Sequence, residues 1–429
     1  MKNTKISLRN KLIYQIYVRN FSKQGTFKEV INELDRIKEL GFDVIYLLPI
    51  HEIGIVGKKG SLGCPYSIRD YRKVASELGT MDDFQILIDE VHKRKMLIMM
   101  DVVYNHTSLD SVLYKTHPEY FYKNELGEVC NKVGNWSDVI DLDYSKDKGL
   151  WKELSLVLVN YSKMGVDAFR CDAASLVPLE FWKYTRKKVN KVNRKIFWLS
   201  ESVHGDFCKH VRDLGFNCAS EPEMYQVFDM AYDYDVYPYF EDYINHKRPL
   251  KDYLEGIKRQ EEIYPRNYVK IKYLENHDTE RIASRVNQDL DKIKNWTAFN
   301  FFQKGAVLFY AGEEYLSDIR PSLFDKDVFN KKGDITDFIK KLTKLKHLSI
   351  FSKGIFNINI PLIDGVAYNT VEDDFKIYHG IFNVGQANGK LKVNLHDGKY
   401  RNYLTGKTIK VLNGYIVLQR DPIIVRIKK

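Results

Sequence analysis

The chain has 429 residues, of which 44% are apolar and 13% aromatic, and its net charge is +10. This length can bury a large core, and the apolar content excludes an intrinsically disordered protein. The basic residues are scattered rather than gathered in a dense patch or tail, so the charge does not predict nucleic-acid binding. The pattern is that of a large globular protein.

The N-terminal segment and the cysteines bear on the compartment. The first ten residues are polar and lack the apolar run of a signal peptide, and no stretch of 18 apolar residues occurs anywhere. The five cysteines include no CxxC pair, so they predict neither a disulfide framework nor a zinc site. We therefore expect a cytoplasmic protein with reduced thiols and no membrane association. The sequence gives no indication of the oligomeric state.

Short apolar runs alternate with amphipathic stretches over most of the chain. The runs expected to be strands are 12–18, 44–50, 96–104, 165–169, 196–199, 269–274 and 306–310. The stretches with helical periodicity are 27–40, 81–93, 150–163 and 179–192. A sixth strand is expected near Phe216 to Ser220, where the signal is weak. Alternating strands and helices predict parallel pairing with right-handed crossovers.

Eight such units predict an α/β fold, a TIM (β/α)8 barrel formed by residues 1–106 and 149–350. The competing fold is a doubly wound open sheet. That fold would favour a glycine-rich phosphate-binding turn after an early strand, and no GxGxxG is present.

Two segments depart from this alternation. Residues 107–148 have no regular pattern and predict a short excursion domain after the third strand. From residue 351 to 429 the helical pattern gives way to short alternating runs separated by Asp-Gly and Asn-Gly turns. We expect this last part to be a C-terminal antiparallel β-domain, with strands at 366–370, 375–382, 391–395 and 424–427.

Charged residues gather where the expected strands end. Asp101 lies in the third strand, Arg170 and Asp172 in the fourth, Glu201 follows the fifth, and Asp278 follows the seventh. The two-residue period of a strand places Arg170 and Asp172 on the same face. In a barrel of this kind the chemistry lies at the carboxyl ends of the strands, so we expect these side chains to meet at one rim.

Asp172, Glu201 and Asp278 together predict an acid–base site. Repulsion and burial would raise the pKa of at least one carboxyl group among three that share a pocket, leaving an acid beside a base. Retaining glycoside hydrolysis needs such a pair, a nucleophile and an acid/base about 5 Å apart. Arg170 would keep Asp172 ionised and oriented.

Four segments and one loop carry a resemblance to a known family. The segments are Asp101 to His106, Gly165 to Ala173, Glu201 after its apolar strand, and Asn276-His277-Asp278, while the loop is Gly63-Cys64-Pro65-Tyr66. Their order and spacing resemble the signature regions of the α-amylase family, glycoside hydrolase family 13. The resemblance covers the whole chain and implies a barrel, a small excursion domain and a C-terminal β-domain.

The resemblance also implies roles for individual residues. It assigns the nucleophile to Asp172, the general acid/base to Glu201 and the third acid, which grips the sugar hydroxyls, to Asp278. Substrate-binding residues are implied at positions Tyr66, His106, Arg170 and His277, with Asp101 as a supporting residue. Positioning and charge stabilisation would then supply most of the rate enhancement.

Several family features differ in this chain. Secreted α-amylases usually place a Lys-His pair after the nucleophile, whereas here the sequence is Asp172-Ala-Ala-Ser-Leu-Val-Pro178. Only Asn105 matches a calcium ligand, and residues 20–27 lack aspartate, so we expect no cofactor and no bound metal. The stretch after the nucleophile resembles intracellular enzymes that act on maltooligosaccharides or cyclodextrins.

The predicted activity is therefore hydrolysis of α-glucans or short maltooligosaccharides through a glycosyl intermediate on Asp172. An α-glucan transglycosylase or an α-glucoside isomerase would use the same intermediate and stays open as an alternative. A catalytically inactive sugar-binding protein is a third interpretation, but such proteins typically lack one of the three acids, and all three are present. The sequence does not distinguish α-1,4 from α-1,6 linkages or define the chain length of the substrate.

Overall fold

The computed structural model describes residues 4–134 and 136–429, and eight parallel strands form a closed barrel. The strand order around the barrel is β1-β12-β11-β10-β9-β8-β5-β2. These strands are β1 (Leu12–Ile16), β2 (Val44–Leu47), β5 (Leu97–Val103), β8 (Ala168–Asp172), β9 (Phe197–Ser200), β10 (Met230–Tyr232), β11 (Lys270–Lys272) and β12 (Ala306–Tyr310). The predicted (β/α)8 barrel is confirmed.

The helices follow the amphipathic stretches of the sequence, and capping residues set several of their ends. Helix α2 buries Phe27, Val30, Leu34 and Ile37 and ends at Gly41, whose φ of 96° needs a glycine. Helix α3 begins with a capping box, in which the Asp83 amide donates to Thr80 Oγ1 and the Thr80 amide donates to Asp83 Oδ2.

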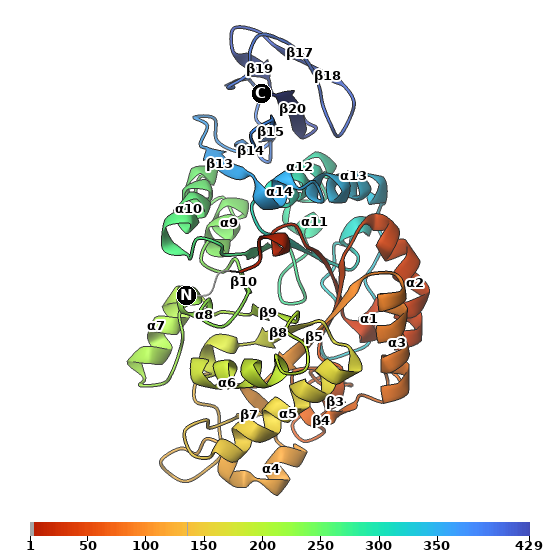
Figure 1. Cartoon of the computed structure of the whole chain (residues 1–429), viewed down its shortest axis with the longest axis vertical. Coiled ribbons are helices and arrows are strands. Elements are labelled where there is room, and N and C mark those ends of the chain that lie inside the picture. Colours follow the sequence, from red (N-terminus) through yellow and green to blue (C-terminus); the bar gives the residue numbers. More distant parts are fainter. Residues whose placement is uncertain (1–3, 135) are drawn as a thin grey trace. The chain divides into compact units, whose positions relative to one another are not determined.

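The helices are α1 (Val18–Phe21), α2 (Phe27–Leu40), α3 (Met81–Lys93), α4 (Val112–Thr116), α5 (Lys148–Met164), α6 (Leu179–Val189), α7 (Gly205–Asp213), α8 (Glu221–Met224), α9 (Tyr237–Ile244), α10 (Leu250–Ile263), α11 (Ile282–Arg285), α12 (Leu290–Phe302), α13 (Thr336–Lys346) and α14 (Ile350–Lys353). Figure 1 shows α5 and α6 beside the strands β8 and β9. None of the helices in the described part of the chain has the length and hydrophobicity of a membrane-spanning segment.

The prediction of a sixth strand at residues 216–220 was wrong. Residues 216–220 form a loop that leads into α8, where Ser220 caps the helix with Glu223. The sixth barrel strand is β10, in which Met230 pairs with Leu199 and Ala231 with Ser200 of β9. The Ser220 hydroxyl donates to Glu223, and the Cys218 carbonyl accepts from Arg212 Nε at 2.8 Å. Because these groups are engaged locally, the segment forms a helix cap instead of a strand ladder.

Short elements lie outside the barrel in the first half of the chain. Strands β3 (His51–Ile53) and β4 (Ile68–Val74) form one antiparallel pair, and β6 (His106–Ser108) and β7 (Val139–Asp141) form another. The second pair encloses the segment for which the sequence predicts an excursion. Its pairing places His106 opposite Asp141.

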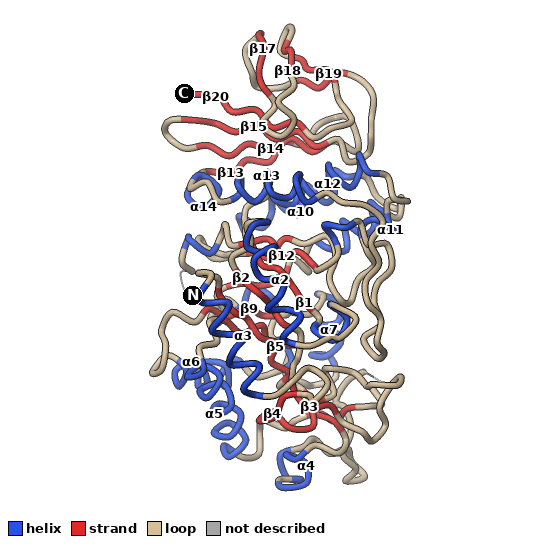
Figure 2. Tube along the Cα trace, turned by 90° about the vertical axis from the view of Figure 1, so that its right-hand side faces the viewer, coloured by secondary structure: helices blue, strands red, loops and turns tan. Residues whose placement is uncertain are grey.

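The C-terminal part is an antiparallel β-domain, as expected. A four-stranded sheet has the order β13 (Ile355–Asn359), β14 (Ala367–Glu372), β15 (Lys376–Phe382) and β20 (Ile423–Lys428). Two further pairs are β16 (Lys390–Lys392) with β19 (Tyr415–Val417) and β17 (Gly398–Arg401) with β18 (Thr408–Val411). Figure 2 shows α12, α13 and α14 alongside β13, β14 and β15.

The chain divides into two compact units. The first contains Ile13–Tyr232 and Pro321–Phe329, and the second contains residues 4–12, Asp233–Arg320 and Asn330–Lys429. The first unit holds Asp172 and Glu201, and the second holds His277 and Asp278.

Candidate active site

Asp101, Arg170 and Asp172 meet in the first unit because of the register of two neighbouring strands. Strand β5 pairs with β8 in parallel, and Asp101 lies beside Arg170 while Val103 lies beside Asp172. Arg170 and Asp172 are two residues apart, so their side chains leave the same face of β8. Strand β9 continues the sheet, and Glu201 follows its last residue.

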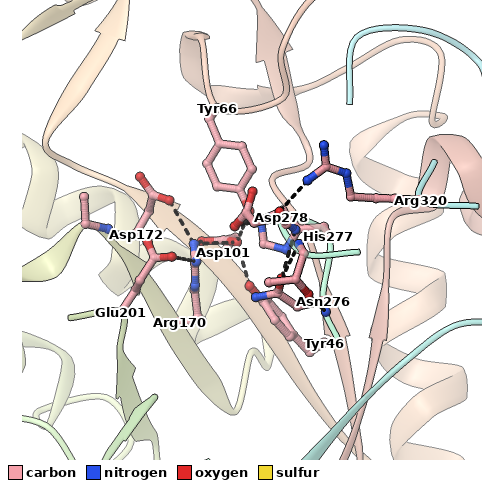
Figure 3. A network of polar contacts seen from close by, with 12 residues as sticks. Tyr46, Tyr66, Asp101, Arg170, Asp172, Glu201, Asn276, His277, Asp278 and Arg320 are labelled. Atoms are coloured by element: carbon pink, nitrogen blue, oxygen red, sulfur yellow. Dashed lines mark hydrogen bonds and ion pairs between the residues drawn. The ribbon is translucent and has the colours of Figure 1, made fainter. Parts of the chain in front are cut away.

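Arg170 contacts three carboxylates (Figure 3). Its Nη1 donates to Asp101 Oδ1 at 2.9 Å and to Asp172 Oδ1 at 2.9 Å. Its Nη2 forms an ion pair with Glu201 Oε1 at 2.7 Å. Asp172 and Glu201 are thus neighbours on one guanidinium group, which matches the notion that Arg170 orients Asp172.

The Arg170 side chain is completely buried, so its charge depends on its partners. Burial lowers the pKa of Arg170, but the negative charges of Asp101 and Glu201 outweigh burial and leave the pKa well above its usual value. The guanidinium group therefore stays protonated and offsets the negative charge of the cluster. The rings of Tyr66 and Tyr232 lie 5.8 and 5.6 Å from its central carbon and add cation–π contacts.

Asp101 is held on both carboxylate oxygens. Oδ2 accepts from the Tyr46 hydroxyl at 2.7 Å and from the Tyr66 hydroxyl at 2.9 Å, and Oδ1 accepts from the Val102 amide at 3.1 Å. Because its side chain is fully buried and saturated with donors, Asp101 supports Arg170 and Tyr66 and is poorly placed to react with a substrate. Sequence reasoning missed Tyr46, which stands within an apolar strand and has no local signal.

Glu201 is fixed by the backbone that follows Asp172. The amide of Ala173 donates to Glu201 Oε2 at 2.9 Å, and the amide of Ala174 donates to the Glu201 carbonyl at 2.9 Å. Ala173 has φ 41° and ψ 36°, the left-handed region that residues other than glycine rarely adopt. In this conformation its amide points to Glu201, a feature that no sequence signal predicts.

His106 lies at the start of β6 and is buried. Burial lowers its pKa, although Asp141 and Asp138 oppose the shift, so the neutral imidazole is favoured. The amide nitrogen of Asn105 lies 3.2 Å from His106 Nδ1 and can donate to it, which leaves Nε2 as the N–H of the ring. Asn105, which matched a calcium ligand, thus contacts a histidine here.

His277 and Asp278 belong to the loop that follows β11 in the second unit. His277 Nε2 lies 3.1 Å from Asp278 Oδ2, and the Asp278 side chain is 46% exposed. Asn276 shapes this loop, since its Oδ1 accepts from the amides of Asp278 and Thr279 at 2.9 and 3.1 Å. Arg320 donates to the Asp278 carbonyl (Figure 3). Sequence reasoning missed Arg320, and an Asx turn at Asn276 could have been recognised from Asn-x-x-Thr.

The described residues contain no group of three or more His, Cys, Asp and Glu side chains arranged to hold a metal ion. The site instead consists of carboxylates around a buried arginine at the carboxyl end of the strands, with a histidine and a tyrosine beside them. This combination on a (β/α)8 barrel is compatible with a carbohydrate-active enzyme.

The family follows from comparison with known proteins. Residues 15–128 and 134–344 match the model described as alpha amylase, catalytic domain, and residues 363–425 match the bacterial alpha amylase C-terminal domain. The chain therefore belongs to the α-amylase family. The family resemblance found in the sequence is confirmed.

Solved structures agree over the whole chain. An alpha-amylase from Lactobacillus plantarum is 39% identical, with a TM-score of 0.95, and the match covers 99% of this chain and 100% of that one. A maltogenic alpha-amylase from Thermotoga neapolitana is 31% identical, with a TM-score of 0.87, over 98% of this chain and 99% of that one.

Curated relatives add a different activity. An alpha-1,4-glucan:maltose-1-phosphate maltosyltransferase from Myxococcus xanthus is 27% identical over 268 residues, which is 57% of this chain and 37% of that protein. The maltosyltransferase from Pseudomonas aeruginosa is 30% identical over 44% of this chain and 32% of that protein. The matched part spans only about a third of the length of these relatives.

Proposed function

We propose that this chain is a retaining α-glycoside hydrolase that acts on α-glucans or short maltooligosaccharides. The observation that carries the proposal is the Arg170 guanidinium group, which holds the carboxylates of Asp172 and Glu201 side by side at 2.9 and 2.7 Å. A retaining mechanism requires two neighbouring carboxyl groups with different tasks. The partner of the enzyme is its glucan substrate, and neither nucleic acid nor membranes have a role.

The roles of the two carboxylates are those that the family resemblance implies. Asp172, ionised beside Arg170, attacks the anomeric carbon while protonated Glu201 gives its proton to the leaving glycosidic oxygen. The bond to the leaving sugar breaks as the bond to Asp172 forms. Glu201 then accepts a proton from water, whose oxygen attacks the anomeric carbon and releases Asp172.

Asp278, His277 and His106 complete the proposed site. Asp278 would grip two sugar hydroxyls as the ring distorts, and this requires that it shares a pocket with Asp172 and Glu201. That convergence stays a prediction. His106, with its Nε2 carrying the hydrogen, would donate to a hydroxyl of the same sugar, and Tyr66 would stack on the ring.

The catalytic test is the Asp172→Asn variant. The side chain keeps its shape but loses the nucleophilic charge, so we expect turnover of maltotriose to fall by at least roughly a thousandfold. Asp167→Asn is the matched control, because Asp167 precedes β8 and pairs with His92 at 2.8 Å. Near-normal activity of Asp172→Asn would refute the assignment.

Transglycosylation is the second candidate, and the maltosyltransferase relatives favour it. In that reaction the hydroxyl of a second sugar takes the place of water in the last step. The products of maltotriose separate the two activities. Glucose and maltose alone indicate hydrolysis, whereas chains longer than maltotriose indicate transfer.

We further propose that the enzyme works in a reducing compartment, the cytoplasm. All five cysteines are free thiols, which supports this assignment. Substrates would then be imported maltooligosaccharides or fragments of stored glucan.

A further inference from the structure

A pocket of about 510 Å³ lies within the second compact unit. Helix α10 and strands β13, β14 and β15 supply most of its walls, and residues near Tyr268, Gln303 and Asn394 supply the rest. None of the residues that line it belongs to the set assigned to catalysis or substrate binding above. Its volume is in the range of small-ligand sites.

Three neutral polar side chains cross the sheet in this pocket. In the antiparallel register Thr370 of β14 lies opposite Asn357 of β13 and opposite His379 of β15. Directly opposite residues point to the same face of a sheet, with their Cβ atoms about 5 Å apart. Asn357, Thr370 and His379 therefore form a polar row, and this row ends at the open edge of the sheet because β13 is the edge strand.

The protonation of His379 follows from its neighbour Tyr368. The Tyr368 hydroxyl accepts from the Asn394 amide at 3.1 Å and lies 2.9 Å from His379 Nδ1, to which it can donate its single hydrogen. In the tautomer that accepts this hydrogen, the imidazole N–H is Nε2. Burial also lowers the pKa of His379 to about 4, which keeps the ring neutral at neutral pH.

His379 Nε2 is a donor that has no protein partner. Among the described residues it makes no hydrogen bond, and the His379 residue is only 1% exposed. Buried donors are nearly always satisfied, and an unsatisfied one lowers stability. His379 lines the pocket, so a ligand that displaces the wall slightly would meet a polar atom without a partner there.

Three of the charged residues that line the pocket, Lys304, Glu261 and Glu372, are in ion pairs. Lys304 Nζ lies 2.7 Å from Glu261, and Glu372 is paired with Lys429 at 2.8 Å while accepting from Asn357 at 3.2 Å. The pocket therefore offers amides, a hydroxyl and an imidazole, together with Ile377, which leaves the same face of the sheet as His379. This mixture suits a neutral ligand with many hydroxyl groups and apolar C–H faces, as a sugar has.

We propose that this pocket is a second carbohydrate-binding site, in which the polar row binds a segment of an α-glucan chain. The substrate class is taken from the proposed function. Hydroxyl groups of the sugar accept from His379 Nε2 and exchange hydrogen bonds with Thr370 and Asn357, and one sugar face packs on the apolar wall. The site tethers long glucans to the enzyme and adds nothing to the turnover of short ones.

The test compares the Thr370→Val/Asn357→Ala variant with wild-type enzyme by affinity electrophoresis in gels containing glycogen. Valine keeps the shape of threonine and suits a strand, so the variant should fold. We expect the apparent affinity for glycogen to fall about tenfold, as for the loss of one or two hydrogen bonds. Turnover of maltotriose and the melting temperature should be unchanged. Thr408→Val is the matched control, since Thr408 is exposed on β18 and does not line the pocket.

Equal retardation of the variant and wild-type enzyme would overturn the proposal. A crystal structure of the full-length Asp172→Asn protein soaked with maltotetraose gives a second readout. Saccharide density against the polar row supports the site, and density only beside the barrel carboxylates overturns it. A wild-type enzyme that turns over no maltooligosaccharide would refute the proposed function instead, and the difference in retardation would still report on the pocket.

Discussion

At the scale of single residues, Arg170 determines the charge balance of the site. A buried guanidinium group costs several kcal/mol to desolvate, and it is retained only where its partners compensate that cost. Here one positive charge faces Asp101, Asp172 and Glu201. The excess negative charge makes proton uptake by one carboxyl group favourable, which is what a general acid needs.

Ala173 is the second residue on which the site depends. Its left-handed conformation (φ 41°) costs an alanine roughly 1–2 kcal/mol, and the hydrogen bond from its amide to Glu201 Oε2 accompanies this strain. Strain at such a position commonly accompanies function.

Substitutions at Ala173 test this interpretation. Ala173→Gly keeps the amide and relieves the strain, so turnover should be retained and the free energy of unfolding should change by less than about 1 kcal/mol. Ala173→Val adds a β-branched side chain that disfavours this conformation further. We expect it to lower stability by more than about 1 kcal/mol and to lower kcat/KM, measured by urea unfolding and maltotriose kinetics. Equal behaviour of the two variants would contradict the assignment.

At the scale of elements, strand register decides which side chains meet. The parallel pairing of β5 with β8 puts Asp101 beside Arg170, and the antiparallel pairing of β14 with β15 puts Thr370 beside His379. A shift of one residue in either pair would turn these side chains to the other face. The chemistry of both sites is therefore a property of paired strands.

The C-terminal sheet should lose stability in acid because of His379. Burial lowers the pKa of this histidine from 6.5 to about 4 in the folded chain, so the unfolded chain binds the proton first as the pH falls. Above pH 6.5, His379 does not reduce the free energy of unfolding. Between about pH 6.5 and 4 this free energy falls, by at most about 3 kcal/mol in total.

This is measured by urea unfolding of the full chain from pH 8 to pH 4. The His379→Gln variant, which keeps an acceptor for the Tyr368 hydroxyl, should show a shallower loss of unfolding free energy than wild type in this range. His396→Gln, at an exposed position on the same domain, serves as control. An unchanged slope in His379→Gln would show that this histidine does not titrate as described.

At the scale of the whole molecule, the proposed chemistry uses carboxylates, an arginine and histidines. We therefore expect that dialysis against EDTA leaves kcat on maltotriose and the melting temperature unchanged. The described residues offer no cluster of ligating side chains, and Asn105 is engaged with His106. A loss of activity or stability that added Ca²⁺ restores would contradict this expectation.

Much of the architecture could be predicted from the sequence because it depends on local periodicity. The ranges predicted for α2, α3 and β12 agree with the observed Phe27–Leu40, Met81–Lys93 and Ala306–Tyr310. The shared face of Arg170 and Asp172 follows from the two-residue period of one strand. Strand β10 could not be found in this way, since it is three residues long and its pairing with β9 outweighs its own weak signal.

The tertiary structure alone decided which groups share a partner. Asp101 and Arg170 are 69 residues apart, and Arg170 and Glu201 meet only because β8 and β9 pair. The same holds for the left-handed turn at Ala173, the donors around Asp101 and the tautomer of His379. Each of these depends on a neighbour supplied by another strand, whereas a sequence pattern reports only on neighbours along the chain.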